Sequence, residues 1–116
     1  MKVIFEKVGT PVFQIEGFEA DDVIGTIGTQ AQGHTGTEVI IITGDRDLMQ
    51  LVNDKVSLYM PIKGMSDMQI VDREKVKERL GVYPERVIDY KALVGDSSDN
   101  YPGVQGIGPV GAIKLI

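Results

Sequence analysis

Four β-branched residues stand in succession at positions 39–42, and they limit the possible folds more than any other segment. Such a run lacks the alternation of a half-buried strand and is typical of a strand covered on both faces in a parallel sheet. An amphipathic helical pattern precedes it, in which Val23, Ile24 and Ile27 share one face. A second strand pattern follows at 56–60. Helix and strand patterns that alternate in this way predict an α/β fold with a mostly parallel sheet and flanking helices.

The remaining segments extend this pattern in both directions. Residues 1–8 predict a helix and residues 11–15 a short strand, and a short helix is expected after the turn at 43–47. The second half predicts one extended piece and two helices, and the helices end at glycines. Their expected ranges are 68–71, 72–80 and 84–94. Because the chain starts within a helical pattern and ends without a cap, we expect a fragment cut at both ends.

The 116 residues include no Cys and a single His, which removes whole classes of chemistry. Disulfides, thiolate metal sites and cysteine nucleophiles are excluded, and His-based zinc sites and Ser-His-Asp triads are disfavoured. No apolar run approaches the roughly 18–20 residues of a membrane span, and nothing resembles a signal peptide. Any chemistry must therefore come from carboxylates, hydroxyls, amines or the backbone.

Seven acidic residues fall into three groups beside predicted helices and strands. The groups are Glu19, Asp21 and Asp22; Asp45 and Asp47; and Asp96 and Asp99. Ligands of open α/β sheets bind outside the carboxyl ends of the strands. The first two groups follow predicted strands and are therefore expected at one edge of the sheet, over which the third group could fold. For any single member, a helix cap is the simpler interpretation.

Carboxylates gathered this closely repel one another and raise each other's pKa values unless a cation neutralises them. Oxygen ligands without Cys or His favour Mg²⁺ or Mn²⁺ over Ca²⁺. Two such ions about 3.5–4 Å apart can clamp the attacking and leaving oxygens of a phosphodiester. The net charge of −5 argues against nucleic acid, but without the seven candidate ligands 10 acidic residues remain against 12 basic ones. The acidic groups thus predict a two-ion site for phosphodiester chemistry.

A glycine-rich loop at 103–108 precedes a helical pattern at 112–116. Glycines let several backbone N–H groups point outward at the start of a helix, which forms an anion-binding concavity. Such a loop holds nucleic-acid phosphates and fixes position rather than sequence. A tight turn between two helices is an equal alternative for the loop alone. Its place just after Asp96 and Asp99 favours phosphate binding.

Four motifs follow one another in a distinctive order: EADD at 19–22, TGDRDLMQLV at 43–52, GDSSDN at 95–100 and PGVQGIG at 102–108. Together they resemble the bacterial 5′-nuclease family, which includes the 5′→3′ exonuclease domain of DNA polymerase I and is related to phage 5′-nucleases and flap endonucleases. The resemblance covers nearly the whole chain. It implies a PIN-like α/β core, of which 1–71 would be the C-terminal part. It further implies a helical region at 72–116 with an incomplete helix-three-turn-helix motif, similar to a helix-hairpin-helix.

The resemblance also implies an activity, namely metal-dependent hydrolysis of 5′ flaps and 5′ ends of DNA, or of RNA primers, in replication and repair. All seven carboxylates match family metal ligands and are the candidate catalytic residues, with two Mg²⁺ or Mn²⁺ ions as cofactors. The hairpin implies contacts with duplex phosphates and a K⁺ ion. Its candidate DNA-binding residues are Gly103, Gln105, Gly106, Ile107, Gly108 and Lys114. A cytoplasmic, nucleoid-associated bacterial protein is implied, without membrane contact or disulfides and with a polymerase module in the same full-length chain.

Two departures from the family pattern lower the expected activity. A Lys-Thr-Ala step usually follows the glycine hairpin, whereas Val110, Gly111 and Ala112 stand here, so a phosphate-contacting Lys is missing. The family's first strand with a metal-binding Asp, a second Asp and the basic helical arch have no counterpart before Met1. Those parts supply metal ligands and the cations that orient the scissile phosphate. We therefore expect little or no nuclease activity from this polypeptide alone.

Three other functions remain open from the sequence. A phosphotransfer receiver or a phosphatase would use one Asp nucleophile and a single Mg²⁺. A PIN-type ribonuclease would share the carboxylates, lack the helical hairpin and prefer single-stranded RNA. A non-catalytic, structure-selective DNA-binding module would bind DNA without metal. The joint occurrence of the 95–100 loop and the glycine hairpin favours the 5′-nuclease.

Overall fold

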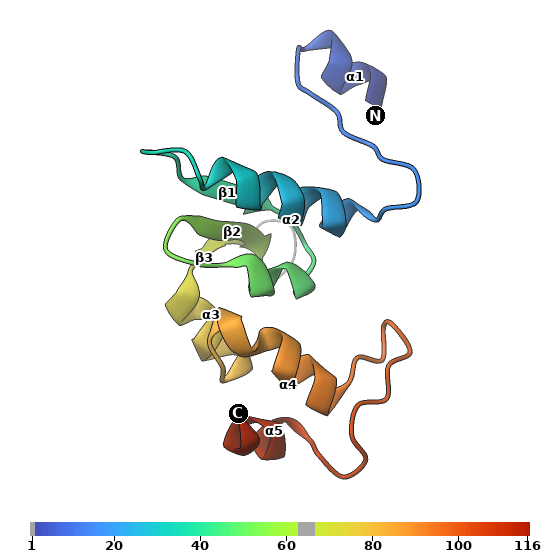
Figure 1. The fold of residues 1–116 in the computed structure, drawn as a ribbon, viewed down its shortest axis with the longest axis vertical. Helices are drawn as coiled ribbons and strands as arrows, with labels where there is room; N and C mark the ends of the chain where they lie inside the picture. The colour runs from blue at the N-terminus through green and yellow to red at the C-terminus, as the bar shows by residue number, and fades with distance from the viewer. Residues whose placement is uncertain (1, 63–66) are drawn as a thin grey trace.

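The computed structural model describes residues 2–62 and 67–116 (Figure 1). Its elements are α1 Lys2–Lys7, α2 Ala20–Ala31, β1 Val39–Ile42, the 3₁₀ helix η1 Asp47–Leu51, β2 Val56–Pro61, β3 Met68–Val71, α3 Arg73–Leu80, the 3₁₀ helix η2 Pro84–Arg86, α4 Val87–Val94 and α5 Pro109–Leu115. Residue 1 and residues 63–66, which belong to the predicted 1–71 unit, lie outside the described residues. The order confirms an α/β fold with flanking helices. Within the described residues, the helices fall short of the length and apolarity that a bilayer crossing requires.

The sheet has three strands in the order β1-β2-β3. β1 and β2 are parallel, and β3 runs antiparallel to β2. The register places Ile41, Leu58 and Val71 side by side across the sheet, and all three are buried. Residues of η1, α3 and α4 join them in one core, which therefore ties the sheet to the helices that follow it. The core cluster comprises Ile41, Leu48, Met49, Val52, Val56, Leu58, Met60, Val71, Val76, Val82 and Val87.

The opposite face of the sheet is open, which corrects the expectation that the 39–42 run is covered on both faces. Ile40 and Ile42 are 57 % and 74 % exposed, and Ile70 of β3 is 47 % exposed. The alternating burial along β1 and β2 shows that the described helices cover one side only. An uninterrupted apolar run indicates that a strand can be buried on both faces. Whether both faces are buried depends on which other elements pack against the strand.

Residues 11–15, expected as a short strand, form none. They belong to the extended link that joins α1 to α2 away from the sheet (Figure 1), and Phe13 and Ile15 are exposed. A strand forms only where a neighbour supplies hydrogen-bond partners, and no described strand pairs with this segment. The first acidic group therefore sits at the N-terminus of a helix, and of the first two acidic groups only the second follows a described strand, β1.

The helices of the second half lie where their capping residues predict. The Asp72 carboxylate accepts a hydrogen bond from the Lys75 backbone N–H at 2.9 Å, and α3 ends at Gly81, whose φ is +80°. The range expected as one helix at 84–94 divides into η2 and α4. α5 packs back against α4, and Ile113 of α5 covers Gly81 so closely that a Cβ atom there would collide with it.

Candidate metal centre

Three carboxylates from distant parts of the chain meet near the C-terminal end of β1. Asp47 begins η1, whereas Asp96 and Asp99 belong to the loop after α4. One oxygen of each lies within 4.8 Å of the others, and Asp47 and Asp96 are half-buried while Asp99 is exposed. One hard cation can take a ligand from each at this spacing. Among the residues that the structure describes, no other trio of carboxylates meets as closely.

The turn between β1 and η1 is held by its own side chains. The Asp45 N–H donates to Thr43 Oγ1 at 3.0 Å, and the Asp47 N–H donates to Asp45 Oδ1 at 2.9 Å. Such local bonds are what Asp and Thr contribute to turns. The next two residues, Leu48 and Met49, are buried and anchor η1 in the core. Asp47 is therefore held in place by the turn before it and by the buried residues after it. One oxygen of Asp45 accepts a hydrogen bond within the turn.

The loop that carries Asp96 and Asp99 is closed by backbone contacts. Asp96 and Tyr101 exchange two backbone hydrogen bonds of 2.8 Å, and the Ser98 N–H donates to Asp96 Oδ1 at 2.8 Å. Gly95 and Gly103 face each other at the base of the loop, with φ values of +81° and +64°. A Cβ atom on Gly103 would lie 2.5 Å from the Gly95 nitrogen. The two backbone segments approach so closely at these positions that only glycine, which lacks a Cβ atom, fits.

Lys91 of α4 links the two halves of the trio, a role that sequence reasoning missed. Its ammonium donates to Asp47 Oδ1 and, at 2.6 Å, to Asp96 Oδ2. Burial opposes the charge of Lys91, but the hydrogen bonds to Asp47 and Asp96 outweigh it and raise the pKa of the ammonium above its usual value. A lone cation in the last turn of a largely apolar helix, just before an acidic loop, was the available signal.

The same contact controls the charge of Asp96. The hydrogen bond from Lys91, supported by the backbone N–H of Ser98, lowers the pKa of Asp96 to about 2. Both partners are therefore charged at neutral pH. The trio carries a net charge of −2 once Lys91 is counted, which leaves room for the positive charge of a divalent ion.

The first acidic group lies at the N-terminus of α2. The Glu19 N–H donates to Asp22 Oδ2 at 3.0 Å, so Asp22 serves the helix cap in part. Asp21 makes no such bond within the described residues. Its burial, followed by repulsion from Asp45, Glu19, Asp47 and Asp22, raises the pKa of the Asp21 carboxyl. The first and second acidic groups therefore act on one another, although they do not form a ligand trio as tight as that of the loop.

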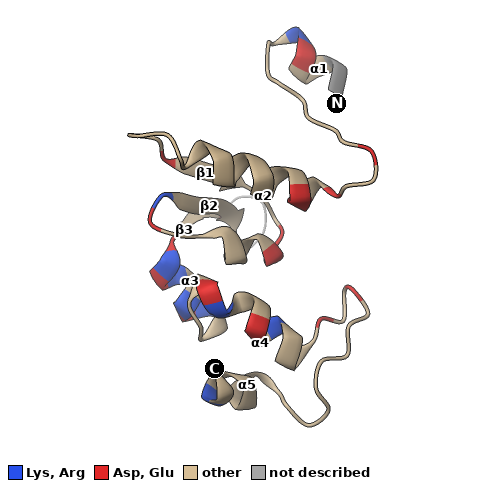
Figure 2. Cartoon of the chain, in the orientation of Figure 1, with Lys and Arg blue, Asp and Glu red and all other residues tan. Residues whose placement is uncertain are grey.

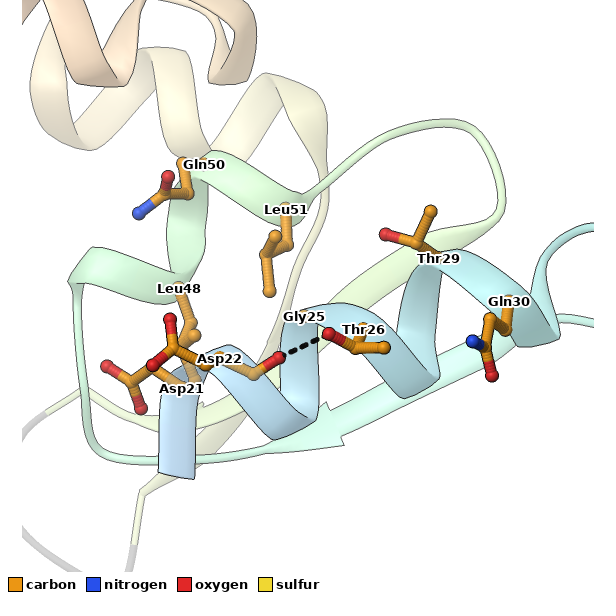
Figure 3. Close-up of a pocket in the computed structure, with 9 residues that line it drawn as sticks. All are labelled: Asp21, Asp22, Gly25, Thr26, Thr29, Gln30, Leu48, Gln50 and Leu51. Atoms are coloured by element: carbon orange, nitrogen blue, oxygen red, sulfur yellow. Dashed lines mark hydrogen bonds between the residues drawn. The ribbon is translucent and has the colours of Figure 1, made fainter. Parts of the chain in front are cut away.

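Figure 2 shows the acidic segments on one side of the molecule, at the start of α2, at the start of η1 and in the loop after α4. A groove of about 530 Å³ between α2 and η1 opens beside the first of these segments. Figure 3 shows Asp21 and Asp22 at one end of this groove, close to Leu48. Of the three acidic groups that the sequence singled out, only the first therefore lines this groove, through Asp21 and Asp22.

The glycine loop lies between α4 and α5; one backbone bond ties it to α4 and another closes a turn within it. The Val104 N–H donates to the Leu93 carbonyl at 2.8 Å, and the Ile107 N–H donates to the Val104 carbonyl at 3.0 Å. Within the described residues, the N–H groups of Gln105, Gly106 and Gly108 donate to no backbone carbonyl. All three residues are exposed, as is Lys114, whereas Gly103 closes the acidic loop and Ile107 is half-buried.

Comparison with known proteins gives a consistent result across both halves of the chain. Residues 1–81 match the family model of the 5′-3′ exonuclease N-terminal resolvase-like domain, and residues 82–116 match that of the 5′-3′ exonuclease C-terminal SAM fold. DNA polymerase I of Bacillus subtilis (strain 168) is 47 % identical over 104 residues, which is 90 % of this chain and 12 % of that protein. The chain thus spans about an eighth of this relative's length.

Two solved structures are similar over nearly the whole chain. A mutant of the T5 5′-exonuclease has a TM-score of 0.83 at 33 % identity, covering 99 % of this chain and 46 % of that one. The bacteriophage T5 flap endonuclease, in a pseudo-enzyme–product complex with DNA and metal ions, has a TM-score of 0.81 at 30 % identity, covering 98 % of this chain and 40 % of that one. On the match over residues 1–81 and its continuation over 82–116, this chain belongs to the 5′-3′ exonuclease family.

Proposed function

We propose that the protein carrying this sequence hydrolyses DNA phosphodiesters at 5′ flaps and 5′ ends, as a metal-dependent 5′→3′ exonuclease and flap endonuclease. The observation that carries the proposal is the meeting of Asp47, Asp96 and Asp99 within 4.8 Å, from segments about 50 residues apart along the chain. The similar T5 flap endonuclease was solved with DNA and metal ions. Family membership supports the same reaction class for this chain.

We propose that two groups of carboxylates hold two Mg²⁺ or Mn²⁺ ions. Asp47, Asp96 and Asp99 would hold one ion, and the set at the start of α2 together with Asp45 would hold the other. When bound, such ions supply positive charge to the attacking and leaving oxygens of the phosphodiester. Burial and, after it, repulsion by neighbouring carboxylates raise the pKa of Asp21, and a bound divalent cation would relieve the repulsion. The set proposed for the second ion is Glu19, Asp21, Asp22 and Asp45.

The chain's own residues also bring the substrate to the site. We propose that 72–116 is a DNA-binding unit in which the exposed N–H groups of Gln105, Gly106 and Gly108 contact duplex phosphates, with a K⁺ ion at the same loop. Lys114 adds a positive charge on α5. Since Val110 occupies the place of a phosphate-contacting lysine in the family pattern, the affinity of this loop for duplex DNA is lower here.

The relatives support a proposal for the biological setting. We propose that the protein acts in the bacterial cytoplasm at the nucleoid, in DNA replication and repair, with a polymerase module in the same full-length chain. The similarity to DNA polymerase I supports this arrangement. Domain 1–71 would then be the C-terminal part of the PIN-like core that carries five of the seven carboxylates.

The test is cleavage of an end-labelled 5′-flap duplex by the intact protein that carries this sequence, with Mn²⁺ or Mg²⁺ and with EDTA. We expect metal-dependent release of the flap, which Asp47→Asn abolishes. Asp89→Asn is the matched control, because Asp89 is an exposed carboxylate of α4 that pairs with Arg86. Preference for single-stranded RNA would instead support a PIN-type ribonuclease, and metal-independent DNA binding without cleavage a non-catalytic module.

A further inference from the structure

Lys91 is placed inside the candidate metal centre rather than at its margin. Its ammonium bonds to Asp47 and to Asp96, and the three side chains are 27 %, 31 % and 23 % exposed. The two carboxylates come from segments on either side of α4 and are 44 and 5 residues from Lys91 in the sequence. The ammonium therefore joins the η1 turn to the loop at 95–101 across the site.

Lys91 bonds to one oxygen of each of two carboxylates that a metal ion at the trio would also use. Mg²⁺ requires its oxygen ligands at about 2.0–2.1 Å in near-octahedral geometry. The two bonded oxygens both face the position that the ammonium occupies. A divalent ion bound between the same two oxygens would lie close to the ammonium and repel it. A divalent ion that takes Asp47 Oδ1 and Asp96 Oδ2 as ligands would therefore have to displace the ammonium.

We propose that Lys91 is a built-in counter-cation of the Asp47–Asp96–Asp99 site, which competes with the divalent ion and withdraws from the two carboxylates when that ion binds. This inference rests on the proposed function, since it requires the trio to bind metal. In the absence of metal, Lys91 keeps the trio assembled and offsets its charge. Its competition lowers the affinity for this ion alone and makes Lys91 a positioning residue.

The second acidic set differs in this respect. Among the described residues, Glu19, Asp21, Asp22 and Asp45 form no ion pair with a lysine or arginine. An ion that binds there displaces no cation, so we expect it to bind first. The ion at the trio binds second, because it must overcome the contacts of Lys91.

The experiment is a Mn²⁺ titration of the intact protein by calorimetry, followed by thermal unfolding without metal. In Lys91→Met the weaker of the two binding steps should tighten by about fivefold, while the stronger step is unchanged. The metal-free variant should melt about 2–6 °C lower, because the trio loses its counter-charge. Lys91→Arg should restore both values toward wild type. Lys75→Met is the matched control, since Lys75 pairs with Glu78 on exposed surface.

Unchanged or weaker Mn²⁺ binding by Lys91→Met would overturn the competition. Asp96→Asn separates this failure from that of the proposed function. If Asp96→Asn removes one ion and Lys91→Met tightens none, the trio binds metal and only the inference about Lys91 is wrong. If wild type and Asp96→Asn bind Mn²⁺ equally, the metal site at the trio is wrong, and the role of Lys91 is wrong with it.

Discussion

The molecule has two clusters of carboxylates, and they differ in how they are assembled and in how their charge is offset. The trio of Asp47, Asp96 and Asp99 is assembled over long range and already contains a cation, Lys91. The group at the start of α2 is local in sequence, and its Asp21 carries a raised pKa because of burial and neighbouring carboxylates. The trio is therefore partly compensated without metal and is called the compensated region below. The group at the start of α2 is called the strained region, because its carboxylates repel one another without a cation paired to them among the described residues. Metal should stabilise the strained region more and rearrange the compensated one more.

The largest effect is expected from removing a proposed metal ligand of the compensated region. If Asp96 is a direct ligand as proposed, Asp96→Asn should lower flap cleavage by at least about 10²-fold, which exceeds the 10–100-fold loss typical of groups that only orient ligands. Single-turnover cleavage of the labelled flap measures it, with Asp89→Asn as the control of equal charge change. A loss below tenfold would show that the trio does not contribute to the reaction.

The next largest effect is expected from a substitution at the base of the loop at 95–103, which carries Asp96 and Asp99. In Gly103→Ala the new methyl group would lie 2.5 Å from the Gly95 nitrogen at a φ of +64°. We expect a loss of about 2–3 kcal/mol in unfolding free energy. Gly106→Ala is the control, because Gly106 has a φ of +83° but open space around it. It should cost only about 1 kcal/mol. Equal losses would mean that the close contact is relieved by a shift of the loop.

Acid should affect the two regions in opposite directions. The pKa of Asp96 is about 2 in the fold and about 3.9 in an unfolded chain. Ionised Asp96 therefore stabilises the fold above about pH 4, and this contribution is lost as the pH falls through about 2. The pKa of Asp21 is raised, so protonation of Asp21 relieves repulsion instead. Urea unfolding of the metal-free protein between about pH 2 and 6 should show a smaller acid loss in Asp96→Asn than in wild type.

The smallest expected effect is a gain of stability. Asp21→Asn removes a charge that its surroundings disfavour, so the metal-free protein should gain about 0.5 kcal/mol. The same substitution should weaken the first Mn²⁺ step in the titration. Asp22→Asn is the comparison, since Asp22 accepts the Glu19 N–H and should gain less. A loss of stability in Asp21→Asn would show that the region is not strained.

Local sequence patterns were sufficient where local contacts decide the structure. Asp72 and Gly81 set the ends of α3 through a cap and a left-handed residue, and the β-branched run at 39–42 gave β1. The strand expected at 11–15 was wrong, because a strand needs a partner that local periodicity does not show. The same limit explains why Ile40 and Ile42 are exposed although their sequence suits a buried strand.

The acidic residues of the site could be selected from sequence because carboxylates without Cys or His leave few alternatives. What could not be selected was the pairing between them. Lys91 lies 44 residues from Asp47, and its place at the end of the largely apolar α4 marks it as unusual without showing which carboxylates it contacts. Distances between side chains depend on how α4 packs on η1, which is a property of the assembled core.

The narrow base of the 95–103 loop has a consequence for where a substrate would be cut. The carboxylates of the loop and the exposed N–H groups of the glycine hairpin are separated by a short stretch of backbone whose two ends are pinned by the Asp96–Tyr101 and Val104–Leu93 bonds. We expect this stretch to keep a constant distance between the proposed phosphate-binding N–H groups and the proposed metal site. Changes to its outward side chains should then alter how fast the strand is severed while the position of the break stays at the same nucleotide.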